Sequence, residues 1–186
     1  HNAEGMRIFS LQLQSGPTEW QIIAMNASPD NATKAIDQVC LVEGKWPPEK
    51  GEIVIERYKL PDTNARVGDM LTLELPSGKI RTLKLVGVVH DQTLGAFSIG
   101  PGFFLAPIQG YISTDDLEEL GQPLPDIYTT LRVTVDPPTD DLDVLQDVAN
   151  RVRQEIEANG GEIISLSLRG SYDHPNRTYV DALSGI

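Results

Sequence analysis

The stretch "GDMLTLELPSGKIRTLKLVGVVHD", residues 68–91, decides the fold. Its first half alternates strictly, with Leu71, Leu73 and Leu75 on one side and Thr72 and Glu74 on the other. A period of two is typical of a strand that buries one face. A Pro-Ser-Gly-Lys turn follows, and residues 80–89 return as a second strand that becomes apolar on both faces. The stretch therefore predicts a β-hairpin whose second strand ends in a buried position.

The segments before this hairpin predict a second hairpin and a short helix. Residues 6–14 and 20–25 have strand-like patterns, and Ser15-Gly16-Pro17 separates them as a turn. Residues 31–40 are compatible with a short helix that ends at Cys40, whose apolar neighbours predict a small buried side chain. Gly44 to Gly51 contains Pro47-Pro48, which fits an extended crossing and no regular element.

The last third of the chain predicts a β-α-β unit. Residues 129–135 and 162–168 alternate as strands, and residues 140–158 between them have an apolar stripe at helical spacing. Acidic residues in the first turn and Asn159-Gly160-Gly161 at the end delimit this helix. The stripe consists of Leu142, Leu145, Val148, Val152 and Ile156.

Together these patterns predict an α+β fold with two lobes. The β-α-β unit, completed by the opening hairpin, forms one discontinuous lobe of residues 1–41 and 127–186. Residues 42–126, with short strands and many breaks, form a β-rich lobe inserted into it. The chain begins His-Asn-Ala without an initiator methionine, so we expect it to be a fragment of a longer protein.

Composition argues against several classes of function. The 186 residues carry a formal net charge of −12, whereas surfaces that bind nucleic acid are basic. The single cysteine allows neither an intrachain disulfide nor a cysteine-based zinc site. Asp136, Asp140, Asp141 and Asp143 lack the spacing of a calcium loop and fit a helix start better. We therefore expect no nucleic-acid partner, no cofactor and no metal.

The pair His90-Asp91 is the one place that suggests catalysis. Neighbouring strand residues point to opposite faces, so Asp91 is badly placed to orient His90 as a general base. The chain also lacks a Gly-x-Ser-x-Gly nucleophile motif and both familiar glycine-rich nucleotide motifs. We interpret the pair as a strand end that reaches solvent. A hydrolase that uses His90 is the weakest of the hypotheses, and we expect no catalytic residue.

The segment from Gly95 to Tyr111 combines glycines and prolines with large apolar side chains. One interpretation is a loop that contacts a partner or an apolar substrate. The other is a loop that folds back over the β-rich lobe. The candidate contact residues are Phe97, Ile99, Phe103 and Phe104.

Three ordered motifs give the chain a family resemblance. They are "VEGKWPPEKGEIVIE", "ARVGDMLTLEL" and "KIRTLKLVGVVHD", with key positions at Gly44, Lys45 and Pro47; Val67, Gly68 and Asp69; and Val86, Gly87 and Val88. In this order they resemble the extracytoplasmic core domain of MacB-type, FtsX-like ABC transporter permeases. The tail "SYDHPNRTYVDALSGI" resembles the return of that family into its second membrane helix.

The resemblance implies a porter-like lobe with an inserted β-rich lobe, and a mechanical function without catalysis. Such a domain lies outside the membrane of a bacterial or archaeal cell and relays movement driven by a cytoplasmic ATPase subunit. The implied partners are that subunit, a second permease copy, and an extracytoplasmic partner protein or cargo. The alternative is a free-standing extracytoplasmic module that binds a peptide, a lipid or a wall component through residues 95–111.

Overall fold

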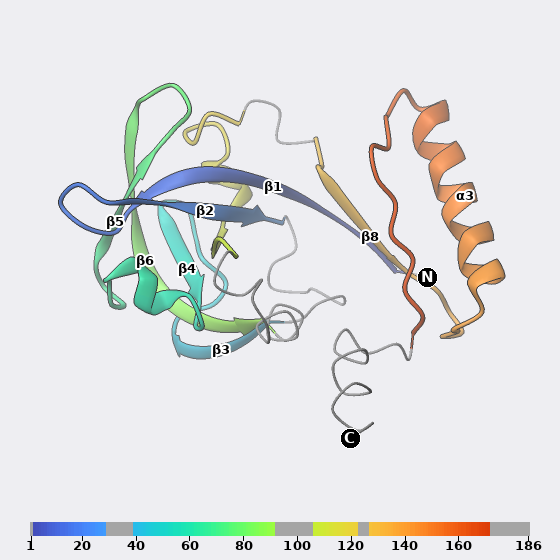
Figure 1. Ribbon diagram of the computed structural model, residues 1–186, viewed down its shortest axis with the longest axis horizontal. Coiled ribbons are helices and arrows are strands. Elements are labelled where there is room, and N and C mark those ends of the chain that lie inside the picture. The colour runs from blue at the N-terminus through green and yellow to red at the C-terminus, as the bar shows by residue number, and fades with distance from the viewer. Residues whose placement is uncertain (1, 29–38, 92–105, 123–126, 172–186) are drawn as a thin grey trace, which may run out of the picture. The chain divides into compact units, whose positions relative to one another are not determined.

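The computed structural model describes residues 2–28, 39–91, 106–122 and 127–171 (Figure 1). The chain divides into two compact units: residues 1–3 with 133–186 form unit 1, and residues 4–132 form unit 2. The boundaries fall inside β1 (Asn2–Gln14) and β8 (Thr130–Thr134). The lobe boundaries expected from the sequence, after residues 41 and 126, stay a prediction.

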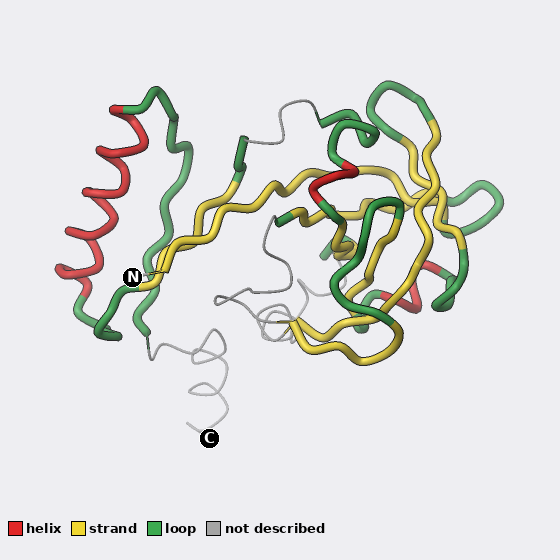
Figure 2. The backbone as a smooth tube through the Cα atoms, turned by 180° about the vertical axis from the view of Figure 1, so that it is seen from behind, coloured by secondary structure: helices red, strands yellow, loops and turns green. Residues whose placement is uncertain are grey.

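Unit 2 is built on a ring of strands, seen from behind in Figure 2. Antiparallel pairs join β1 to β2, β4 to β7, β5 to β6 and β5 to β1, and parallel pairs join β2 to β7 and β4 to β6. Each of these strands therefore has a neighbour on both sides, and the sheet closes into a barrel. The strands added to β1 are β2 (Trp20–Ala27), β4 (Glu52–Glu56), β5 (Met70–Glu74), β6 (Ile80–Asp91) and β7 (Ile108–Ile112).

Two further strands adjoin the ring. β3 (Val39–Gly44) pairs antiparallel with the last part of β6, beyond the part that β5 covers. β8 follows β1 in the strand order. The mixed sheet and the single α-helix of the described residues confirm the α+β class.

Both predicted hairpins are confirmed. β5 and β6 pair in the register Leu71 with Leu83, and Gly78 takes a φ of +77° in the turn between them. β1 and β2 pair from Arg7 with Ala27 to Gln14 with Trp20. The opening hairpin lies next to β8 in the strand order and has two further pairings: β1 pairs with β5, and β2 pairs with β7. These two pairings close the ring.

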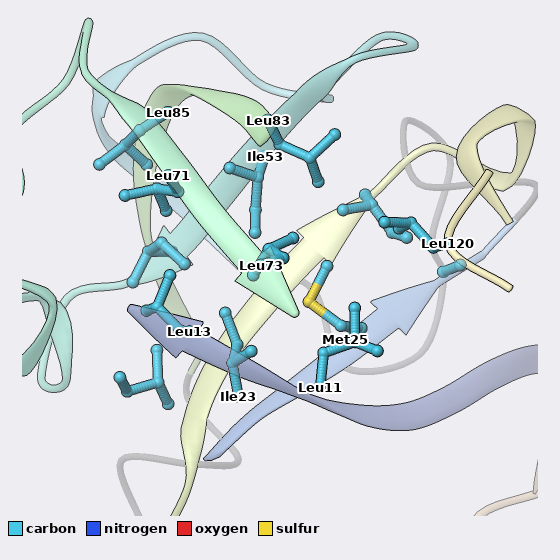
Figure 3. Packing of buried hydrophobic residues seen from close by; sticks show 14 of the residues in the cluster. Leu11, Leu13, Ile23, Met25, Ile53, Leu71, Leu73, Leu83, Leu85 and Leu120 are labelled. Atoms are coloured by element: carbon cyan, nitrogen blue, oxygen red, sulfur yellow. The ribbon is translucent and has the colours of Figure 1, made fainter. Parts of the chain in front are cut away.

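The inside of the ring is filled by apolar side chains (Figure 3). Each strand contributes alternate residues, as expected where one face of a sheet is buried. Because aliphatic side chains fill this interior, the barrel has a packed core. The core includes Leu11, Leu13, Ile23, Met25, Ile53, Ile55, Leu71, Leu73, Leu83, Leu85, Ile108 and Ile112.

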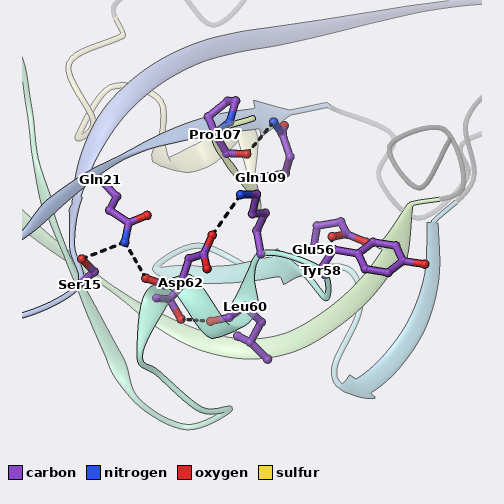
Figure 4. A network of polar contacts seen from close by, with 10 residues as sticks. Ser15, Gln21, Glu56, Tyr58, Leu60, Asp62, Pro107 and Gln109 are labelled. Carbon is purple, nitrogen blue, oxygen red and sulfur yellow. Dashed lines mark hydrogen bonds and ion pairs between the residues drawn. The ribbon is translucent and has the colours of Figure 1, made fainter. Parts of the chain in front are cut away.

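A short 3-10 helix, η1 (Leu60–Thr63), is fastened to the turn of the first hairpin (Figure 4). The amide nitrogen of Gln21 donates to the hydroxyl of Ser15 and to the carbonyl of Asp62, at 3.3 and 3.1 Å. The side-chain amide of Asn64 donates to the Ser15 carbonyl at 2.6 Å. A second 3-10 helix, η2 (Thr114–Asp116), is capped by Ser113.

Unit 1 contains the predicted helix, α3 (Leu142–Ala158). The carboxylate of Asp141 accepts hydrogen bonds from the backbone N–H groups of Asp143 and Val144, which caps the first turn. The helix ends at Ala158, Asn159 is its C-cap residue, and Gly160 follows with a φ of +84°. The start and end signals in the sequence are therefore confirmed to within two residues.

The predicted strand at residues 162–168 is wrong. These residues form no strand, and Ile164 is 95% exposed. Alternation describes which face a strand would bury, but a strand exists only where a neighbouring chain pairs with its backbone. The backbone of the returning segment is instead fastened at its far end, where the N–H of Ser171 donates to the carbonyl of Thr139 at 2.9 Å.

The expectations for Cys40 are also wrong. Val39 and Cys40 are the first residues of strand β3, so they are not helical. The side chain of Cys40 is exposed and not buried. Residues 31–38, the rest of the expected helix, lie outside the described residues. Apolar neighbours in sequence did not indicate burial here, because Leu41 and Val42 are themselves about half exposed, at 48% and 53%.

Replacing Leu73 by alanine tests the barrel core. The Leu73 side chain is fully buried, so its truncation should lower the free energy of unfolding by about 2–5 kcal/mol. Met70→Ala is the matched control on the same strand, because Met70 is 57% exposed and should cost less than about 1 kcal/mol. Urea unfolding measures both. Equal losses in the two variants would contradict the packing described.

Candidate functional site

The three motifs of the sequence meet at one part of β6, residues 85–87. Gly44, from the first motif, is the register partner of Gly87. The backbone N–H of Lys45 donates to the carbonyl of Val86 at 2.9 Å. From the second motif, the N–H of Gly68 donates to the carbonyl of Leu85 at 2.7 Å. Residues that are 17 to 43 positions apart in sequence thus share one attachment point, which we call the motif junction.

The N–H of Leu85 completes the contact with the second motif, because it donates to the carbonyl of Asp69 at 2.8 Å. The carboxylate of Asp69 also accepts a hydrogen bond from the backbone N–H of Arg66 at 2.8 Å, which closes the turn over residues 66–69. Gly68 lies between them with a φ of +106°. The Val-Gly-Asp sequence therefore forms a turn that docks on β6 through a reciprocal pair of backbone hydrogen bonds.

Glycine is required on both sides of the β3–β6 contact. A Cβ atom on Gly87 would overlap the backbone carbonyl oxygen of Lys45, and one on Gly44 would overlap that of Val86. Gly44 also has a φ of +79°, a conformation that disfavours residues with a Cβ atom. The glycines of the first and third motifs are thus explained by the close approach of two backbones.

Beside the junction, Lys45 forms a small ion-pair group. Its ammonium lies 2.9 Å from the carboxylate of Glu52 and 3.0 Å from that of Glu49. The backbone N–H of Glu49, followed by the ammonium of Lys45, lowers the pKa of the Glu52 carboxyl. Such partly exposed pairs contribute little to stability.

Trp46 covers the outer side of the barrel wall next to the junction. Its ring meets the ring of Tyr111 edge to face, with centroids 5.6 Å apart. Together with Val54 and Val89 these residues form a second apolar cluster. β4 and β7 are therefore buried on both faces at this point, which the apolar run Ile53-Val54-Ile55 reflects in the sequence.

His90 and Asp91 do not pair with one another. Nδ1 of His90 lies 3.5 Å from Oε1 of Glu56, and Asp91 accepts a hydrogen bond from the hydroxyl of Tyr111 at 2.7 Å. The expected separation of the two side chains is what the structure shows. The expectation that the strand end reaches solvent is wrong for Asp91, which is 6% exposed.

Glu56 is the residue that sequence reasoning missed. It follows the apolar run of β4 and has the appearance of a solvent-facing strand end, yet it is 2% exposed. Its burial raises the pKa of the carboxyl, against the lowering effect of the Tyr58 backbone N–H and of His90. Burial also raises the pKa of the Tyr111 hydroxyl, and the charge of Asp91 adds to this effect. The signal available in the sequence was that β4 is apolar on both faces, which predicts cover over its end as well.

The predicted contact residues Phe97, Ile99, Phe103 and Phe104 lie outside the described residues, so their role stays a prediction. Within the described ranges, no group of three or more acidic, histidine or cysteine side chains is arranged to hold a metal ion. No helix in the same part of the chain has the length and hydropathy needed to cross a membrane.

Two solved transporter domains align with the chain. The extracellular domain of the noncanonic ABC-type transporter YknZ from Gram-positive bacteria aligns with a TM-score of 0.55 and 11% identity, over 87% of this chain and 77% of that one. The periplasmic region of MacB from Actinobacillus actinomycetemcomitans aligns with a TM-score of 0.48 and 10% identity, over 100% of this chain and 77% of that one.

Neither a protein-family model nor a curated protein sequence matches the chain. At 11% identity the likeness to the YknZ domain shows the fold alone. The class that follows is therefore structural: an α+β domain with the architecture of an ABC transporter's extracellular domain, which is the fold the sequence motifs led us to expect.

Gly87→Ala tests the motif junction. The added methyl group meets backbone and not a flexible side chain, so we expect a loss of about 1–3 kcal/mol or more in the free energy of unfolding. Gly16→Ala is the matched control, because the three atoms nearest to the new Cβ there belong to the side chain of Glu19 and none is closer than 3.2 Å, so its effect should stay within about 0.5 kcal/mol. Thermal unfolding compares the two. A Gly87→Ala protein as stable as the control would mean that β3 does not approach β6 this closely.

Proposed function

We propose that this chain is the extracytoplasmic domain of an ABC transporter permease and that it has a mechanical role without catalysis. The observation that carries the proposal is the fold, which aligns with the YknZ extracellular domain over 87% of the chain. The three motifs support it, because residues chosen for a family resemblance converge on one structural junction.

The architecture of unit 2 suits the transmission of force. Its strands form a closed ring with a packed aliphatic interior, and such a body moves as a whole because close-packed interiors deform little. The two boundaries with unit 1 fall in β1 and β8, which are neighbours in the strand order. Because β1 and β8 belong to the sheet of the ring, a force applied to these two strands would move the whole sheet.

The partners follow from this role. In the proposal, a cytoplasmic ATPase subunit drives movement of membrane helices that lie outside the 186 residues, and a second permease copy completes the transporter. An extracytoplasmic partner protein or cargo receives the movement. Residues 95–111 remain the proposed contact segment for that partner, and the domain would reside on the outer side of a bacterial or archaeal cell membrane.

The exposed thiol of Cys40 provides a test of this location. In the full-length protein within intact cells, with every other cysteine replaced by serine, a membrane-impermeant maleimide should label Cys40, because the side chain is exposed and the domain lies outside. Cys40→Ser in the same background is the matched control and should remain unlabelled. Labelling that appears only after the cells are lysed would place the domain on the cytoplasmic side and refute the proposal.

A further inference from the structure

Strand β3 of unit 2 is rich in apolar residues and yet has no buried one. The four residues from Val39 to Val42 are apolar, and only Val39 packs against an apolar cluster. Cys40 is exposed, and Leu41 and Val42 are 48% and 53% exposed. A strand that faces solvent normally carries polar residues on its exposed side. Packing among the described residues therefore does not account for the composition of β3.

One edge of β3 pairs with no strand of the described residues. The other edge pairs with β6, in the register Cys40 with His90 and Gly44 with Gly87 (Figure 1). β6 is the one described strand that pairs with β3. In an antiparallel ladder every second residue directs its N–H and C=O groups away from the partner strand. The outer edge of β3 therefore presents backbone groups that can bond to one more strand.

β3 carries few of the features by which proteins protect such an edge from pairing. These features include lysine or proline on the strand, very short strands and β-bulges. β3 contains neither lysine nor proline, and its one bulge is the register shift between Leu41 and Glu43. A bulge bends its strand. A segment that adds to β3 must therefore follow this bend, which a short flexible peptide does more readily than the edge of a second folded sheet.

The charges beside the outer edge of β3 are mainly negative. Glu43 is the one charged residue of β3, is exposed, and belongs to none of the ion pairs of the described residues. Beyond Gly44, the carboxylates of Glu49 and Glu52 share the ammonium of Lys45. The whole chain carries a formal net charge of −12. Such a field attracts a basic segment and repels a second copy of this chain.

We propose that the outer edge of β3 binds a short extended segment of a partner protein, rich in β-branched and basic residues. The backbone of that segment continues the sheet beyond β3. Its apolar side chains pack beside those of β3, and its basic side chains pair with Glu43. In this mode of recognition, main-chain hydrogen bonds give the affinity and alternate side chains give the specificity. The inference uses only the geometry and charge of unit 2 and does not rest on the proposed transporter role.

A capped synthetic peptide of alternating valine and lysine, added to the 186-residue chain, tests the proposal. Its binding should shift the NMR signals of the β3 amides, and the outward-facing N–H groups of β3 should gain at least about threefold protection from hydrogen exchange. A peptide with glutamate in place of lysine should bind at least about tenfold more weakly, because its charge has the wrong sign. A peptide with proline in place of valine keeps the positive charge but cannot form a regular strand, so it should not protect these N–H groups.

Leu41→Lys and Ile80→Lys are a matched pair of protein variants. The two residues are 48% and 47% exposed, and both variants add the same charge. Leu41 lies on β3, whereas Ile80 is the first residue of β6 and pairs with Glu74 of β5. Leu41→Lys should weaken binding of the lysine peptide at least about threefold, because like charges on neighbouring strands repel. Ile80→Lys should change it less than about twofold, since distant exposed charges are screened. Equal effects of the two variants would overturn the proposal.

Three other results would also overturn the proposal. Strong protection of the outward-facing β3 amides without peptide would mean that another segment of the chain already occupies the edge. Equal binding of the valine and proline peptides would mean that charge alone attracts them. A dimer in sedimentation that Leu41→Lys abolishes, and that the lysine peptide does not dissociate, would make a second copy the occupant.

Discussion

The structure of unit 2 depends on the close approach of β3 to β6 at Gly44 and Gly87. Only at this distance can the N–H of Lys45 reach the carbonyl of Val86. That bond positions the crossing segment that follows, in which Trp46 covers Tyr111 and the outer face of β4. One residue earlier on β6, Leu85 exchanges backbone hydrogen bonds with the turn that begins β5. A single strand thus holds two separate parts of the chain, residues 44–46 and residues 68–69.

This arrangement explains why three weak motifs, taken together, predicted the right fold. Each motif by itself is a turn or a short apolar run, and such patterns occur in many proteins. Their glycines and backbone groups nevertheless belong to one contact in the structure. The α+β class, both hairpins and helix α3 were accessible from the sequence for a simpler reason: each is specified by local periodicity and by turn or cap residues.

The features that the sequence did not predict depend on contacts between distant segments. The pattern at residues 162–168 is that of a strand, but no alternation can supply the neighbouring backbone that a strand needs. Cys40 has apolar neighbours, yet β3 is exposed. Glu56 and Asp91 are polar strand ends, yet both are buried in the folded chain, at 2% and 6% exposed. Closure of the ring also depends on contacts between distant segments, since it requires β1 to pair with β5 and β2 to pair with β7.

The division into two units gives the proposed role a physical basis. Unit 2 has a closed, well-packed interior, whereas the apolar stripe of α3 in unit 1 has Leu145 as its one buried member. Under the proposal, unit 2 is the body that passes on displacement, because its interior is closely packed. In the same proposal, another subunit hydrolyses ATP, and this domain passes on the resulting movement.

The proposed role is tested most directly by the distance between spin labels in the two units of the full-length transporter, reconstituted with its ATPase subunit. Cys40 labels unit 2, and Asp147→Cys on the exposed side of α3 labels unit 1. Pulsed electron paramagnetic resonance should give different distributions of the distance between the two labels in the nucleotide-free and ATP-bound states. An ATPase variant unable to bind ATP should give the nucleotide-free distribution throughout. Identical distributions in both states of the active transporter would contradict the account.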